Sequence, residues 1–153
     1  MTDQVSKMME FVASCGDAKK LRQIAENADI RGVPDLARAA RLKLYSILPG
    51  EDPGTLEFAV WQSIFALEDV LKQERGKTIM LSRTRQKIGR QGVQKCVSDL
   101  ILGSASEGFK MLHDRALLDL SFEAVALKHP DRFDDIVLDA ARIRLAEVGY
   151  SVP

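Results

Sequence analysis

Apolar residues recur along most of this chain at intervals of three and four, which is the spacing of one face of an α-helix. Near the start, Met8, Phe11 and Val12 share such a face. A second helix is expected after Asp17, a residue type that caps helix N-termini, and a third after Pro34, which suits a first helical turn. The pattern therefore predicts three helices within the first 50 residues.

The longest apolar stretch follows Asp52-Pro53, read as a capping residue and a proline at the first helical position, and predicts a helix over about residues 54–74, with Gly76 as its stop. A helix that is apolar around most of its circumference packs on several sides. We therefore expect this helix to be the central one of the fold. Its apolar residues cover more than one face: Leu56, Phe58, Ala59, Val60, Trp61, Ile64, Phe65, Leu67, Val70 and Leu71.

Two shorter helices are expected next, separated by Gly92. Ser82 is placed to cap the first of them, which runs through Arg90. Further on, Ser104 and Glu107 have the spacing of a capping box, in which each side chain accepts a hydrogen bond from a free backbone amide. These signals place three helix boundaries between residues 82 and 107.

The last third of the chain is also helical in its spacing. Ser121 can cap a short helix that His129-Pro130 interrupts. A final helix is expected over about residues 133–148, and Tyr150 is expected in a frayed end beyond it. The apolar residues that this helix is expected to turn inward are Ile136, Val137, Ala140, Ile143, Leu145 and Val148.

The predicted fold class is all-α, a compact bundle of about seven to nine helices around the long helix of residues 54–74. Apart from residues 78–81, no stretch has the alternation typical of a strand. A single helical domain over residues 1–153 is expected, because no Gly-, Ser- or Pro-rich linker interrupts the chain. The alternative is a pair of sub-bundles, 1–75 and 92–153, joined by residues 75–95.

Composition indicates an ordinary globular protein, with 46% apolar and 29% charged residues. The two cysteines, Cys15 and Cys96, form neither a disulfide framework nor a zinc-binding spacing, and both are interpreted as inert thiols in a reducing compartment. No apolar run reaches the roughly 18 residues that a membrane span requires. The N-terminal residues also lack the apolar region of a signal peptide. We expect a soluble, cytoplasmic protein with no membrane partner.

The distribution of charge along the chain suggests a function. The chain carries 22 basic and 22 acidic residues, but they are not evenly mixed. No acid lies in the 24 residues between Glu74 and Asp99. A folded protein tolerates such a run where water, acidic residues from elsewhere in the chain, or an anionic partner screens it. We call its seven cations the basic strip: Arg75, Lys77, Arg83, Arg85, Lys87, Arg90 and Lys95.

The leading interpretation is a non-catalytic binding protein that engages nucleic-acid phosphates through the basic strip. Arg83, Lys87 and Arg90 would share one helix face, and such a face can lie along a phosphate backbone. Contacts to bases are not expected, because no aromatic residue for stacking lies between Phe65 and Phe109. Two alternatives stay open: the strip pairs with acids of its own chain, or it meets an acidic protein surface or a second copy in an interaction or homo-oligomerisation module.

Other chemistry finds little support in the sequence. Gly76-Lys77-Thr78 resembles the end of a phosphate loop, but Leu71 stands where that loop needs a glycine. His113 and His129 lack the neighbours of a helical metal site. We therefore expect no catalytic residues, no metal site and no cofactor.

Overall fold

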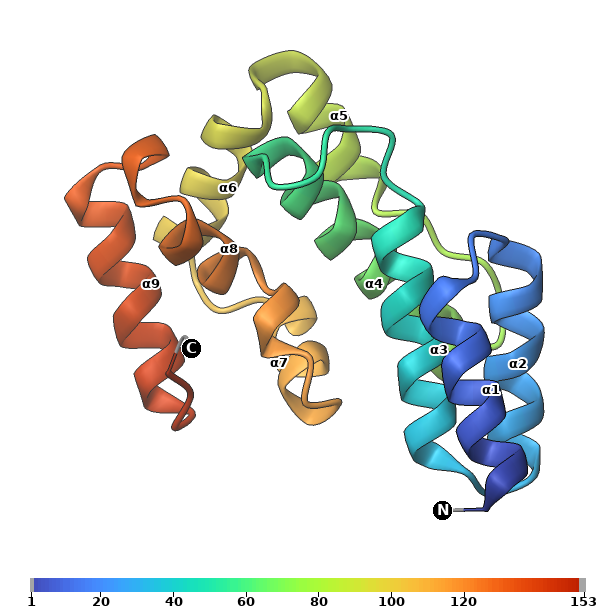
Figure 1. The fold of residues 1–153 in the computed structure, drawn as a ribbon. Coiled ribbons are helices and arrows are strands. Elements are labelled where there is room, and N and C mark those ends of the chain that lie inside the picture. The colour runs from blue at the N-terminus through green and yellow to red at the C-terminus, as the bar shows by residue number, and fades with distance from the viewer. Residues whose placement is uncertain (1, 152–153) are drawn as a thin grey trace. The chain divides into compact units, whose positions relative to one another are not determined.

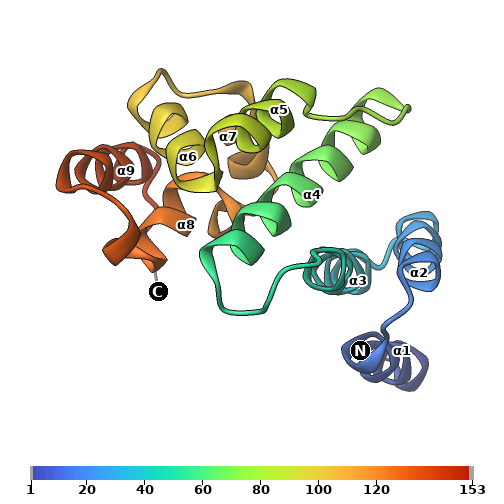
Figure 2. The same ribbon diagram turned by 90° about the horizontal axis from the view of Figure 1, so that it is seen from above.

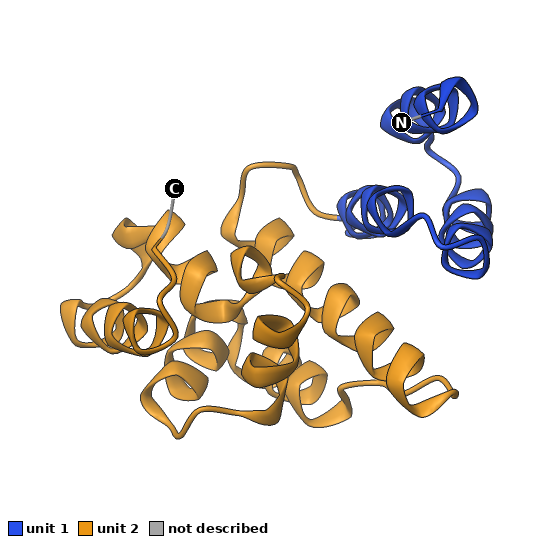
Figure 3. Ribbon diagram, turned by 90° about the horizontal axis from the view of Figure 1, so that it is seen from below, with its two compact units in different colours: residues 1–50 blue, residues 51–153 orange. Residues whose placement is uncertain are grey.

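The computed structural model describes residues 2–151, and within that range it contains nine α-helices, two short 3-10 helices and no strand (Figure 1). The all-α prediction is thereby confirmed. The chain divides into two compact units, residues 1–50 and 51–153 (Figure 3). The division follows Gly50, whereas the sequence offered residues 75–95 as the joint between sub-bundles. A single domain over residues 1–153 stays a prediction.

The first unit consists of three helices whose axes run in similar directions, so that Figure 2 shows all three nearly end-on. The third helix packs against both of the others. Asp17 accepts hydrogen bonds from the backbone amides of Lys19 and Lys20, and Pro34 opens the third helix, as the sequence predicts. The helices are α1 (Asp3–Ser14), α2 (Ala18–Ile30) and α3 (Pro34–Ile47).

The second unit holds the remaining elements. Its longest helix is α4, which has 20 residues and contacts α6, α7, α8 and η1, so it is the central helix that the sequence predicts. The elements are α4 (Leu56–Arg75), α5 (Ser82–Gln91), α6 (Val93–Leu102), α7 (Glu107–Asp114), η1 (Leu118–Leu120), α8 (Phe122–Lys128), η2 (Pro130–Arg132) and α9 (Asp135–Glu147).

Several helix ends lie where the residue types predict them. Gly76 has a φ of 72°, in the left-handed region that glycine favours, and ends α4. Ser121 caps α8 by accepting a hydrogen bond of 3.1 Å from the amide of Ala124. The start of α4 lies two residues later than expected, because Gly54 has a φ of 87° and Thr55 is the capping residue.

Three predicted caps are wrong, the first being Asp52, because Thr55 stands directly before the first residue of α4. Ser82 is the first residue of α5, and the capping position belongs to Leu81. Ser106, not Ser104, caps α7, where its hydroxyl accepts a hydrogen bond of 3.1 Å from the amide of Phe109. A cap must stand directly before the first helical residue, and composition alone does not distinguish two serines that are two residues apart. Glu107 is therefore the first residue of α7 instead of the partner in a capping box.

The inward face of the last helix also differs from the prediction. Ile136 and Ile143 are 72% and 61% exposed. Both the expected and the observed set of apolar residues follow helical spacing, and packing of α9 against α6 and α8 selects between them. Tyr150 is not frayed either, since it packs against the core of this unit and donates its amide to the carbonyl of Leu145. The buried residues of α9 are Val137, Leu138, Ala141 and Leu145.

The core of the second unit follows α4 in two clusters. Val60 and Ile64 pack with residues of α6, α8 and α9, whereas Val70 and Leu71 pack with α7 and η1. Leu81, in the segment that connects α4 to α5, packs against both clusters. Among the described residues, none of the helices combines the length and hydropathy needed to cross a membrane.

Candidate anion-binding surface

The basic strip extends over three helices and one connection of the second unit. Arg75 is the last residue of α4, and Lys77 lies in the connection that follows. Four members stand on α5, and Lys95 stands on α6. Helices α5 and α6 pack together and are joined by Gly92 alone, with a φ of 86°. The sequence therefore placed this break correctly.

Arg85 does not face an outside partner, because its guanidinium is held by Glu68 of α4. The Nε–Oε2 and Nη2–Oε1 distances are 2.8 and 2.6 Å, the two-point geometry that makes arginine–carboxylate pairs strong. The side chains of Arg85 and Glu68 are 26% and 10% exposed. The hydrogen bonds that its guanidinium donates to Glu68 raise the pKa of Arg85 above its ordinary value. Arg85 therefore stabilises the packing of α5 against α4 and is not available to an anionic ligand.

Two further contacts fix this pair. The backbone amide of Leu81 also donates a hydrogen bond of 2.8 Å to Oε2 of Glu68. This bond satisfies one of the amides at the start of α5 that have no partner within the helix. The Arg85 guanidinium also lies 5.2 Å from the ring centre of Trp61, within the range of a cation–π contact. Glu68 thus anchors the first turn of α5 to α4.

Lys87 and Lys95 share one carboxylate. The Nζ of Lys87 lies 2.8 Å from Oδ2 of Asp99, and the Nζ of Lys95 lies 2.9 Å from Oδ1. Hydrogen bonds from both lysines, that from Lys87 first, lower the pKa of Asp99. Two positive charges against one negative charge leave this group with a net positive charge.

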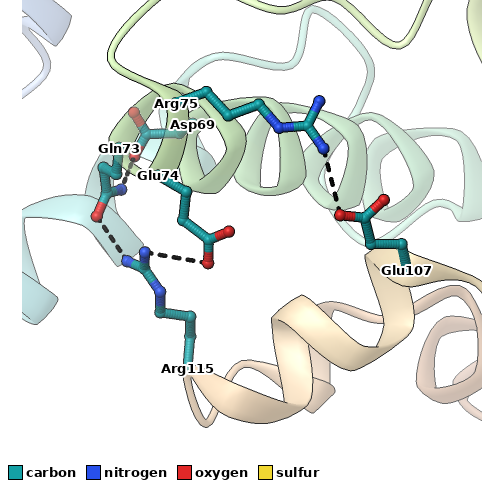
Figure 4. A network of polar contacts seen from close by, with 6 residues as sticks. All are labelled: Asp69, Gln73, Glu74, Arg75, Glu107 and Arg115. Atoms are coloured by element: carbon teal, nitrogen blue, oxygen red, sulfur yellow. Dashed lines mark hydrogen bonds and ion pairs between the residues drawn. The ribbon is translucent and has the colours of Figure 1, made fainter.

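Arg75 makes an exposed ion pair that Figure 4 shows between the end of α4 and the start of α7. Its Nη2 lies 3.2 Å from Oε1 of Glu107, and the two side chains are 46% and 73% exposed. In the same view Arg115 bonds to Gln73 and Glu74 of α4. Exposed pairs of this kind contribute little to stability, so Arg75 can exchange partners with solvent at small cost.

The other three cations of the basic strip have no carboxylate partner among the described residues. Lys77, Arg83 and Arg90 are exposed, and none of the hydrogen bonds and ion pairs within residues 2–151 involves their side chains. Arg83 and Arg90 stand seven residues apart on α5, which puts them on one face of the helix. Lys87 lies between them on that face. The predicted face therefore exists, although its middle member is already paired with Asp99.

The basic strip is thus partly neutralised by its own unit, the alternative that the sequence left open. Four of its seven cations have a carboxylate partner, and the three partners are Glu68, Asp99 and Glu107. The sequence held one signal for this outcome. Glu68 follows Ile64 by four residues and precedes Leu71 by three, so it lies on the buried face of α4. A buried carboxylate requires a cation. Lys72 is the nearest one along the chain, but it is exposed and makes no pair with Glu68, so the sequence indicates that Glu68 needs a cation without identifying Arg85 as that cation.

Other reactive groups in the second unit do not form a site together. Burial raises the pKa of the Cys96 thiol, and its sulfur faces the carbonyl of Thr84 at 3.9 Å. In the described part of the chain, no three His, Cys, Asp or Glu side chains gather as metal ligands. The basic strip therefore stays the candidate surface.

Comparisons of the chain with protein-family models, curated proteins and solved structures returned no match. What the protein binds must be inferred from its own residues and distances.

Proposed function

We propose that this protein is a non-catalytic binding protein that engages nucleic-acid phosphates through one face of α5. The observation that carries the proposal is the exposure of Arg83 and Arg90 without a carboxylate partner. They stand on a ten-residue helix that contains no acid. A folded surface that retains unpaired arginines on one helix face attracts a multiply charged anion.

The dimensions of this face suit a polyanion. Seven residues of helix rise about 10.5 Å, so the Arg83 and Arg90 positions span a length that holds about three successive phosphates of one strand along a duplex axis. Lys87 stands between them and keeps a net positive charge in common with Lys95 and Asp99. Arginine also suits phosphate oxygens, since its planar guanidinium can donate two parallel hydrogen bonds.

Internal pairing lowers the expected strength of binding. If all seven cations contacted phosphate, the logarithm of affinity would fall with the logarithm of salt concentration with a slope of about −6. With Lys77, Arg83 and Arg90 as the free contacts, the expected slope is about −3. The proposed complex is therefore weak at physiological salt and independent of base sequence.

The test is fluorescence anisotropy of a labelled DNA duplex over a series of KCl concentrations. Replacement of Arg83 and Arg90 by glutamine should weaken binding at low salt and flatten the slope by about 2. The matched control is the double change Arg22→Gln and Arg31→Gln, which removes the same charge from exposed positions of the first unit. That control should keep the slope of the unmodified protein.

Two results would overturn the proposal. The first is equal flattening in both double variants, which would indicate a response to net charge alone. The second is the absence of binding at the lowest salt concentration with the unmodified protein. A labelled single strand and an RNA duplex, measured in the same way, would show which nucleic acid the face prefers.

A second candidate function is a homo-oligomerisation module, in which a second copy of this chain is the partner. The exposure of Ile136 and Ile143 on one face of α9 favours it, because large apolar side chains at seven-residue spacing can pack against a like face. Light scattering at several protein concentrations measures the mass. A dimer that the double change Ile136→Ser and Ile143→Ser abolishes would favour this function over the first.

A further inference from the structure

The second unit contains a cavity of about 350 Å³ whose lining comes from residues between Ser63 and Glu123. Its walls are formed by α4, the connection that follows it, the start of α5, the end of α6, α7 and the start of α8. Most of the lining side chains are apolar, among them Ile64, Leu67, Phe109 and Phe122. A volume in this range, with mostly apolar walls and few polar groups, is typical of small-molecule sites.

The charged groups of this cavity are already neutralised. Arg75 and Glu107 pair with each other, and Oε2 of Glu123 lies 2.7 Å from Nη1 of Arg144. An anion that displaced Glu107 from Arg75 would replace one carboxylate by another, and a cation would have to displace Arg75 or Arg144, so a charged ligand gains no additional pairing. The walls favour an uncharged molecule.

Two hydroxyl groups that line the cavity, those of Ser63 and the partly exposed Thr84, are left without a partner among the described residues. Ser63 is 3% exposed and lines the cavity, and none of the hydrogen bonds among residues 2–151 involves its hydroxyl. By contrast, the Ser121 hydroxyl donates to the carbonyl of Leu118 and accepts from the amide of Ala124. The Ser106 hydroxyl accepts from the amide of Phe109. Of the two unpartnered hydroxyls, that of Ser63 is the buried one, so it gains most from a hydrogen bond to a ligand.

We propose that this cavity binds an uncharged, mainly apolar small molecule with one hydrogen-bonding group that meets the Ser63 hydroxyl. Apolar cavities of about 150 Å³ accept a benzene ring. The larger volume here accommodates a bicyclic ring or an acyl chain of similar size. This site is independent of the α5 face, so either proposal can fail alone.

The test compares three probes that share a naphthalene skeleton: 1-naphthol, naphthalene and 1-naphthoate. Calorimetry on the full chain should give the tightest binding for 1-naphthol. Naphthalene should bind about three- to ten-fold more weakly, because it cannot make the hydrogen bond to Ser63. The anion 1-naphthoate should bind at least ten-fold more weakly than 1-naphthol.

A Ser63→Ala variant sharpens this comparison. It should bind 1-naphthol about as weakly as naphthalene and should leave naphthalene affinity unchanged. Ser14→Ala, on the exposed side of α1, is the matched control and should change nothing. Methyl NMR of Leu67 and Leu112, which line the cavity, reports where the probes bind.

Three results would overturn the proposal. They are binding of 1-naphthoate as tight as that of 1-naphthol, an unchanged preference for 1-naphthol in Ser63→Ala, and probe-induced shifts confined to methyl groups outside the cavity.

Discussion

Arg83 and Arg85 stand two residues apart on the same helix and have opposite environments. Arg85 makes two bonds to a nearly buried carboxylate and lies against the ring of Trp61. Arg83 is exposed and has no partner among the described residues. Because residues two apart point in different directions on a helix, one arginine belongs to the core side of α5 and the other to the solvent side.

An acid-free run of sequence is therefore not an acid-free surface. The second unit carries 14 basic and 16 acidic residues, and three of those acids reach the strip from α4, α6 and α7. The proposed binding face consists of the cations that remain after this internal pairing. It is smaller than the run of cations suggests.

The largest effect is expected from Arg85→Met, which keeps an apolar stem against Trp61 but leaves Glu68 without its cation. Breaking a buried pair strands a charge, and at this partly exposed site the loss of unfolding free energy should be about 2–3 kcal/mol. Urea unfolding followed by circular dichroism measures it. Arg83→Met, the matched control, should change the unfolding free energy by less than about 0.5 kcal/mol.

A second change tests the cause of that loss. If the stranded carboxylate is responsible, Glu68→Gln added to Arg85→Met should recover part of the lost stability. If Arg85→Met and Arg83→Met were equally stable, the Arg85–Glu68 pair would not contribute to stability, and the distinction between a structural arginine and a solvent-facing one would be wrong.

The next effect is a gain of binding in Asp99→Asn. This change frees Lys87 and Lys95, so the salt slope of duplex binding should steepen by about 2. Asp139→Asn is the matched control, since it removes an exposed, paired acid from α9. A slope equal to that of the control would mean that the two lysines do not face the nucleic acid.

A smaller effect should accompany acidification. Because Lys87 and Lys95 lower the pKa of Asp99 in the folded protein, their stabilising contribution is present above the ordinary aspartate pKa of about 3.9 and is lost as pH falls through the lowered value. Thermal unfolding midpoints measured from pH 7 to pH 2.5 should therefore fall more steeply below pH 4 in the unmodified protein than in Asp99→Asn. Parallel curves would contradict the pairing.

The smallest effect is expected from Glu107→Gln, which removes the exposed partner of Arg75. Its cost should be below about 0.5 kcal/mol, because solvent screens an exposed pair. Urea unfolding measures this cost as well. If Glu107→Gln lost as much unfolding free energy as Arg85→Met, the difference in exposure between the Arg75–Glu107 and Arg85–Glu68 pairs would not determine how much each contributes to stability.

Much of the secondary structure could be predicted because its signals are local. Gly76 and Gly92 supply backbone angles that other residues rarely adopt, and Asp17 and Ser121 cap helices through atoms three residues away or fewer. The wrong predictions concern features that depend on contacts between helices. The choice between Ser104 and Ser106, and between the two apolar faces of α9, depended on which register packs against neighbouring helices.

Residue types and their spacing are enough to predict that the chain is helical, where most of its helices break, and that seven cations follow one another without an acid. Which of those cations remain available depends on how the helices pack. Asp99 lies close in sequence, but Glu68 precedes Arg85 by 17 residues and Glu107 follows Arg75 by 32, so packing of α4, α5 and α7 brings them together. The physical reason is that a charge acts through space, whereas helical periodicity acts along the chain.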